Sequence, residues 1–267
     1  MENFYDQELI KELTLKREKL EDRIQRFRLS YPSLELNSDS YEYFFHGYLR
    51  RLNLIQECIH NIYKICPIDC LIKGGSKDKS LINNITINLQ TIIINVAGCL
   101  DNLVRFYVDQ KGCNAFKNHR DYTFFGSKFK KNVSEEFRKN INHLDETWNK
   151  PYFKQFRDGL AHRVPLFVPP YFLYQDDINE INNKYSPPKN GDIEAQIAYV
   201  YDTGRARESI GHFRPIMQGS FKENGYIPFH QQILKDCEIV VELGERVFDE
   251  LALSRNKYDQ SIFDDIS

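Results

Sequence analysis

A run of six residues, RDGLAH at positions 157–162, brings together side-chain types that phosphodiester chemistry requires. On a helix, Arg157 and His162 lie about 140° apart around the axis and flank one edge of its surface. A guanidinium that is always charged can stabilise a phosphoryl oxygen that gains negative charge, while an imidazole moves protons near neutral pH. Asp158 lies one turn before His162 and can orient the imidazole. The spacing therefore predicts Arg157, Asp158 and His162 as catalytic residues that need no metal.

The same spacing of arginine and histidine occurs three times in the chain, so the spacing alone is weak evidence. Arg138 and His143 fall in a charged segment that we expect to be an exposed helix. Arg207 and His212 fall in a glycine-flanked segment whose pattern does not predict a helix. Only the pair in 157–162 combines an acid directly after the arginine, the small residues Gly159 and Ala161, and a well-capped helix with an aromatic buried face. We therefore place the candidate site there.

The run FRDGLAHR at 156–163 resembles the signature of the HEPN superfamily, compact helical bundles whose motif is an arginine, a polar residue, a few variable positions and a histidine. The resemblance implies a mainly α, up-and-down bundle of the HEPN type, in which the motif helices of two protomers face each other in a homodimer. It also implies a metal-independent endoribonuclease of the toxin or defence type, with RNA as substrate and a cognate antitoxin or partner protein. Arg157, Asp158 and His162 would then be site residues, with Asp101 or Asn102 from an earlier helix as an auxiliary.

Other functions stay open. HEPN-like proteins also include non-catalytic interaction or RNA-binding modules, which act as dimers or with a partner. In a purely structural interpretation, Arg157 and Asp158 form an ion pair at a helix end, and His162 interacts with the helix dipole. A small-ligand sensor has less support, because the sequence contains no Gly-rich phosphate-binding loop.

Residues 111–131 carry six basic side chains against a single acid, Asp121, with aromatic residues between them. Such a mixture suits phosphate contact and base stacking. The residues predicted to bind RNA are Lys117, Arg120, Lys128, Lys130 and Lys131, together with Arg163 beside the motif. The alternative, which we favour, is a connector whose aromatic residues pack against the core while its charges stay in solvent.

Apolar residues recur at helical spacing in four long segments, 9–27, about 38–65, about 80–109 and about 228–253. Shorter helices are predicted at 134–143 and from an N-cap at Asn149 to the motif. Prolines at positions 165, 169 and 170 end the motif helix, because proline cannot donate the intrahelical hydrogen bond. The candidate site thus lies in the last turns of a short helix.

Residues 165–225 are rich in proline and glycine, and we interpret them as an irregular insertion into a single helical domain that spans 1–256. Within it, the alternation of Ile197, Tyr199 and Tyr201 predicts a strand over 193–201, in a small β-hairpin. The acidic residues 257–267 are expected to form a loose tail.

The formal net charge of −2 excludes the strongly basic balance that drives non-specific nucleic-acid binding, so any RNA contact must be local. No apolar run is long enough to span a bilayer, and the charged N-terminal segment lacks the core of a secretory signal. We therefore expect a cytoplasmic protein without a membrane contact. Cys66 and Cys70 have no second ligand pair at zinc spacing, so we expect free thiols, no metal and no cofactor.

Overall fold

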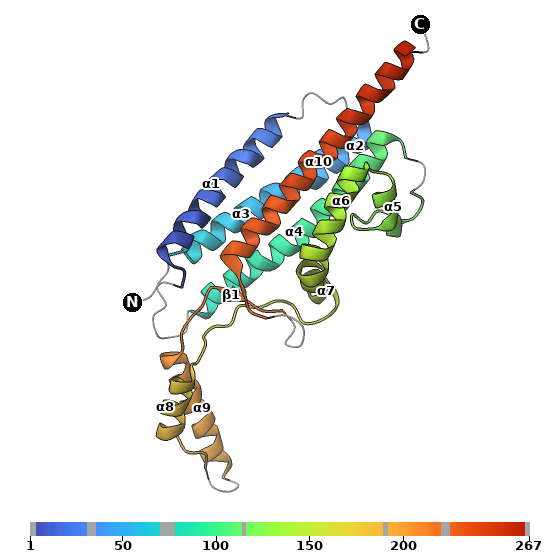
Figure 1. Cartoon of the computed structure of the whole chain (residues 1–267). Helices are drawn as coiled ribbons and strands as arrows, with labels where there is room; N and C mark the ends of the chain where they lie inside the picture. Colours follow the sequence, from blue (N-terminus) through green and yellow to red (C-terminus); the bar gives the residue numbers. More distant parts are fainter. Residues whose placement is uncertain are drawn as a thin grey trace.

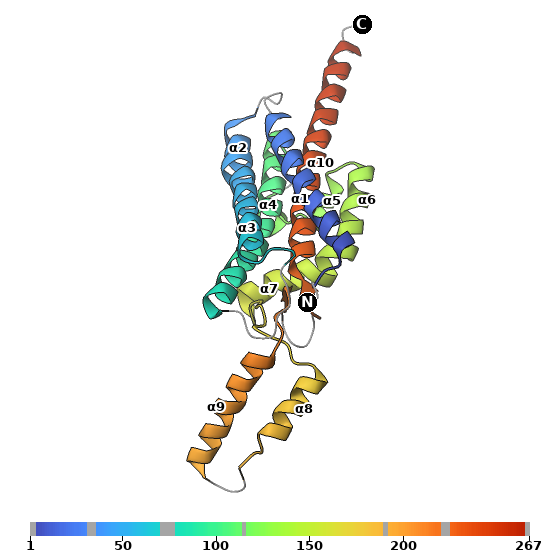
Figure 2. The same ribbon diagram turned by 90° about the vertical axis from the view of Figure 1, so that its left-hand side faces the viewer.

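Four long helices lie side by side along their length and form the body of the molecule (Figures 1 and 2). The computed structural model describes residues 4–30, 36–69, 78–113, 116–188, 192–219 and 225–264. Helices α3 and α10 both pack on α4, and α1 packs on α10, so α4 is the central helix. The four helices are α1 (Gln7–Ser30), α3 (Arg50–Ile65), α4 (Lys79–Lys111) and α10 (Phe229–Asp264). The mainly α prediction is confirmed.

Helix α4 shows why the apolar spacing predicted the bundle. Every residue of its predicted stripe is buried, namely Ile82, Ile85, Leu89, Ile92, Val96, Leu100, Leu103 and Tyr107. The helix begins at Asp78, whose carboxylate accepts a hydrogen bond from the backbone N–H of Ser80. It ends at Gly112, which has a φ of 66°, a left-handed conformation that glycine adopts without steric cost.

By length and composition α4 is, among the described helices, the one apolar enough to cross a membrane. Half of its most apolar window is buried inside the bundle. The core helix of a soluble protein meets the same criteria, and the central position of α4 is consistent with a soluble protein.

The predicted helix over 38–65 is confirmed, but its first half contains a widened turn. It begins at Asn37, whose side chain caps the backbone N–H of Ser40, and runs through α2 (Ser38–Tyr41) and the π-helix η2 (Glu42–Leu49) into α3. Phe44 and Tyr48 of η2 are fully buried among aromatic rings of α1, α4 and α10. Residues 70–77, which include Cys70, lie outside the described residues.

The prediction of two separate helices over 134–162 is wrong. The segment is continuous and runs through α6 (Glu135–Leu144), the π-helix η4 (Asp145–Phe153) and α7 (Lys154–His162). Asn149 is not an N-cap but lies inside η4, where its side chain donates to Asp145 at 2.7 Å. Pro151 also lies inside η4. A widened turn tolerates a missing N–H, so the proline does not begin a new helix here.

The connector before this segment contains two short elements, the 3-10 turn η3 (His119–Asp121) and α5 (Ser127–Lys131). Helix α6 begins at Ser134, as predicted, and the Ser134 hydroxyl accepts a hydrogen bond from the backbone N–H of Phe137.

The proline-rich insertion is not irregular, which corrects the prediction for 165–225. It contains α8 (Gln175–Lys184) and α9 (Ile193–Ile210), which form a helical arm that projects from one end of the bundle (Figures 1 and 2). The predicted strand over 193–201 is therefore wrong. Asp192 caps α9, and its apolar residues fit a helical period as well as an alternating one, so alternation alone was misleading.

The β-structure of the described residues lies at the end of the insertion and directly after it. Strands β1 (Ile216–Met217) and β2 (Ile227–Pro228) pair antiparallel, with Ile216 opposite Pro228. Helix α10 then continues to Asp264, well beyond its predicted end near 253. Residues 257–264 of the predicted tail are therefore helical, and residues 265–267 lie outside the described part.

Candidate functional site

The helix that carries the motif is tied to α10 by a buried carboxylate. The Trp148 indole N–H donates to Oδ1 of Asp236 and the Tyr152 hydroxyl donates to Oδ2, both at 2.8 Å. The Trp148 ring stacks on Phe153 with centroids 4.5 Å apart, and Phe156, directly before Arg157, is buried. These contacts fix the rotation of α7 about its axis, and so decide which residues of the motif face outward.

Asp236 itself is a structural group. Its side chain is fully buried, and burial raises the pKa of this carboxyl to about 6, against the effect of hydrogen bonds from Trp148, Gln232 and Tyr152. A buried carboxylate without such donors would cost several kcal/mol. Because solvent does not reach it, we assign it to holding the motif helix rather than to chemistry.

Arg157 and Asp158 lie on the outward side of α7, where each side chain is about two-fifths exposed, at 42% and 39%. Arg157 donates to Oδ1 of Asp158 from Nε at 3.1 Å and from Nη2 at 2.8 Å. An ion pair this exposed contributes roughly 0–1 kcal/mol to stability, so its arginine stays available to a competing anion. His162 is the last residue of α7, and its side chain lies outside the described part of the structure.

Asp101, the predicted auxiliary residue, lies beside the motif because α7 packs against α4. Its side chain is exposed at the surface, yet neighbouring protein displaces enough water to raise its pKa. Three guanidinium groups act against that rise, Arg157 most strongly, followed by Arg105 and Arg51. The structure therefore gathers positive charge from α3, α4 and α7 around one carboxylate.

Arg105, one turn after Asp101, is held between two aromatic rings. Its guanidinium carbon lies 4.6 Å from the ring centroid of Tyr122 in the connector and 5.5 Å from that of Tyr43 in η2. Cation–π contacts of this kind orient the planar guanidinium without neutralising its charge. The arrangement places a guanidinium group between the aromatic rings of η2 and the connector.

Asn102, the other predicted auxiliary, has a packing role. Its side-chain amide donates to the backbone oxygen of Gly98 at 2.7 Å, and it lies so close to Gly47 that a Cβ there would be 2.5 Å from Asn102 Cγ. Asn102 also lines a groove of about 390 Å³. Charged groups on that groove come from η2 and α3 and include Glu42, His46, Arg50 and Arg51.

Several basic and aromatic side chains of the connector form ion pairs or pack within the protein. Lys128 pairs with Asp121 at 2.6 Å and Lys130 pairs with Asp145 at 3.0 Å. The aromatic residues Phe116, Phe124 and Phe129 are buried. The favoured interpretation of a connector that packs on the core is thus supported for these residues. The remaining predicted RNA contacts are exposed, namely Lys117, Arg120, Lys131 and, beside the motif, Arg163.

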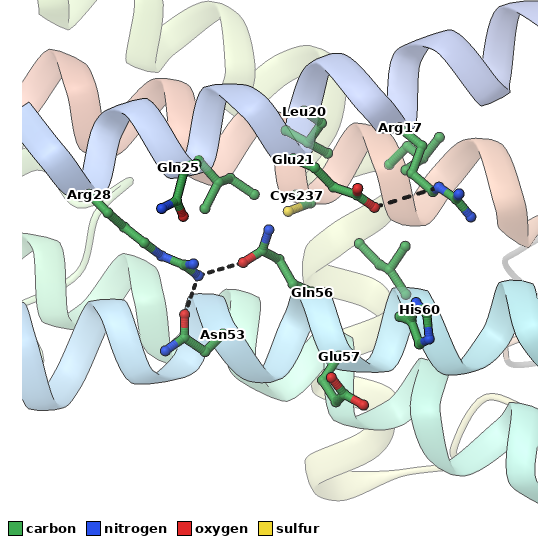
Figure 3. A pocket seen from close by; sticks show the side chains of 13 residues that line it. Arg17, Leu20, Glu21, Gln25, Arg28, Asn53, Gln56, Glu57, His60 and Cys237 are labelled. Carbon is green, nitrogen blue, oxygen red and sulfur yellow. Dashed lines mark hydrogen bonds and ion pairs between the residues drawn. The ribbon is translucent and has the colours of Figure 1, made fainter.

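A separate groove of about 440 Å³ lies between α1 and α3, with Cys237 of α10 in its floor (Figure 3). Arg28 crosses it and donates to the side chains of Asn53 and Gln56. At the other end Arg17 pairs with Glu21 at 3.6 Å. Its apolar floor is already buried by packing, so the groove offers little surface to a ligand.

Comparison of the chain with known protein families, with curated proteins and with solved structures finds no match. Among the described residues, no group of three or more histidine, cysteine or acidic side chains could hold a metal ion.

Sequence reasoning singled out Asp101, and Tyr122 as one of the aromatic residues of the connector, but it missed Arg51 and Arg105. A signal for Arg105 was present, since it interrupts an otherwise apolar helix one turn after Asp101. Arg51 and Tyr122 reach the site from other elements, and their placement depends on how those elements pack. Spacing within one segment could not have revealed them.

Proposed function

We propose that this chain is a HEPN-type, metal-independent endoribonuclease whose site is built on α7 and the facing surface of α4. The observation that carries the proposal is the convergence of the Arg157, Arg105 and Arg51 charges on Asp101, at an exposed surface beside the motif. A surface of this kind attracts a phosphodiester by charge and orients it by planar guanidinium groups.

In the proposed reaction the RNA 2′-hydroxyl attacks the adjacent phosphorus and the bond from phosphorus to the 5′-oxygen breaks. The products are a 2′,3′-cyclic phosphate and a 5′-hydroxyl, and no water or metal is consumed. The His162 imidazole takes the proton of the attacking hydroxyl, and Arg157 leaves Asp158 to stabilise the charge on the phosphoryl oxygens. With two copies in a dimer, the second imidazole supplies the proton to the leaving oxygen.

Arg105 and Tyr122 bind the nucleotide next to the scissile bond, through its phosphate and its base. The exposed Lys117, Arg120, Lys131 and Arg163 extend this surface. The biological role proposed is that of a toxin or defence nuclease acting on cytoplasmic RNA, held in check by a cognate partner protein.

A second function is favoured by one specific observation. Arg157 is held by its own neighbour Asp158 through two hydrogen bonds, as in a helix end that serves structure only. A non-catalytic RNA-binding or interaction module, acting as a dimer or with a partner protein, fits that pairing. It would bind RNA at the arginine surface without turnover.

Salt-dependent binding of a single-stranded RNA tests the proposed surface. Arg105→Gln should weaken binding about fivefold to tenfold and reduce the slope of log K against log salt by roughly 0.7, the loss of one phosphate contact. Arg26→Ala, an exposed arginine on α1, is the matched control and should change neither quantity. Equal binding by wild type and Arg105→Gln would contradict the placement of RNA on this surface.

A further inference from the structure

The arm formed by α8 and α9 buries too few residues to form a stable hydrophobic core of its own. Among its described residues, Ile181 of α8 and Thr203 of α9 are buried, while most of the others are exposed. Figures 1 and 2 show the arm extending away from the end of the bundle, so the four long helices do not cover its outer face. Isolated helices of this length are marginal in water, and two helices with so few buried contacts need a further packing partner.

The outer face of α9 carries a continuous apolar stripe. Ile193, Ile197, Val200 and Tyr201 follow helical spacing and have exposed fractions between 58% and 70%. Together with Gly204 they cover an arc of about 100°. The side of α9 that carries Tyr199 and Thr203 is less exposed and faces away from the stripe. The stripe is thus a face that neither the arm nor the bundle covers.

At Gly204, near one end of the stripe, no side chain projects from the surface of α9. A Cβ at Gly204 would meet no atom within 4 Å, so the position is open. Small residues let two helices approach closely, and a large side chain such as Ile193 from another helix can lie over such a position.

The charged residues beside the stripe can form ion pairs with those of a second copy of α9. In an antiparallel pair of α9 helices centred between Tyr199 and Val200, Glu194 lies opposite Arg205 of the other copy on one edge. Same edges meet in an antiparallel pair, so the contact occurs twice. A parallel pair brings opposite edges together, so it would not form the contact between Glu194 and Arg205.

We infer that the outer stripe of α9 is a self-association surface, on which a second copy of this chain packs its own α9 antiparallel. The interface consists of the four apolar side chains of each copy, the open Gly204 position of each copy and the two ion pairs between Glu194 and Arg205. Since the contact is a single helix pair, it is small, and dimers are expected at micromolar concentrations. The inference does not rest on the proposed nuclease function, because no residue of α7 takes part.

Sedimentation velocity of the full chain, from about 1 to about 100 µM, measures this association. Ile197→Lys places a charge in the centre of the stripe and should raise the dissociation constant at least about tenfold. Ile87→Lys is the matched control, because Ile87 is also an exposed isoleucine, at 60%, but lies on α4. It should leave association unchanged. A dimer that survives Ile197→Lys uses another surface and overturns the inference, as does a chain that is monomeric throughout.

A charge exchange keeps the test independent of arm folding. Glu194→Arg or Arg205→Glu alone should each weaken association about fivefold, because like charges then face each other across both edge contacts. The double variant restores opposite charges and should recover wild-type association. Failure of the double variant to recover, with both single variants weakened, would overturn the antiparallel register.

Cross-linking locates the symmetry axis. Val200→Cys places two thiols next to each other at the centre of the pair and should form an intermolecular disulfide above the wild-type background under mild oxidation. Ile193→Cys, near the end of the stripe, should not. Equal cross-linking of both variants would contradict the register.

Discussion

At the scale of single residues, the buried carboxylate of Asp236 decides how the motif helix is held. Its two oxygens receive the Trp148 and Tyr152 donors, which belong to the same helical segment as Arg157. Asp236→Leu should lower the free energy of unfolding by about 2–4 kcal/mol, because it leaves two buried donors unpaired. Asp236→Asn keeps an acceptor and should cost about half as much. Chemical denaturation measures both, and an equal loss for both variants would contradict the hydrogen-bonding argument.

Two buried groups give stability opposite dependences on pH. The pKa of Asp236 is raised to about 6, so the folded state binds this proton more tightly than the unfolded chain, and stability falls as pH rises from about 4 to 6. Burial lowers the pKa of His230 to about 4, so the unfolded chain binds that proton more tightly. The His230 contribution therefore rises with pH between about 4 and 6.5.

Paired variants separate these two contributions. We expect the stability advantage of wild type over His230→Gln to shrink as pH falls from about 6.5 to 4, and its advantage over Asp236→Asn to shrink as pH rises from about 4 to 6. Denaturation series at several pH values would check both slopes. Differences that do not vary with pH would contradict the assignment of these two groups as buried.

At the scale of secondary-structure elements, the close contact between α10 and η2 requires a glycine at position 244. A Cβ on Gly244 of α10 would lie 2.4 Å from the hydroxyl oxygen of Tyr48, which donates to the backbone oxygen of Val240. Gly244→Ala should therefore destabilise the chain by about 1–3 kcal/mol despite the better helix propensity of alanine.

Gly204→Ala is the matched control for this substitution. It is also a glycine inside a helix, but space around it is open, so alanine there should leave stability unchanged or raise it slightly. Thermal unfolding of the two variants would compare them. A Gly244→Ala variant as stable as wild type would show that α10 and η2 do not pack as described.

The sequence was informative for elements that repeat one period over many residues. The stripe of α4 and the start of the helix at Ser134 were predictable because a local rule determines each of them. The widened turn around Pro151 was not predictable, since a proline two residues after an asparagine is typical of a helix start. Tertiary contacts such as that of Trp148 keep the segment helical. Helix α9 was misread because its outward apolar stripe, which packs on nothing in one chain, also fits an alternating pattern.

At the scale of the whole molecule, the site combines residues that are distant in sequence. Arg157 and Asp101 were proposed together from the resemblance to a family motif, and the packing of α7 on α4 places their charges close enough to interact. The contribution of Arg51 depends on α3 packing beside α4, which no local pattern encodes. The arm and the motif helix lie at the same end of the bundle (Figure 1).

Cleavage of a single-stranded RNA in the presence of a chelator, with analysis of the product ends, tests the central claim most directly. Wild type should cut and leave 2′,3′-cyclic phosphate and 5′-hydroxyl ends. His162→Ala should abolish cutting, whereas His143→Ala, an exposed histidine on α6 with the same spacing from an arginine, should cut normally. Undiminished cleavage by His162→Ala, or no cleavage by wild type while RNA still binds, would contradict the account.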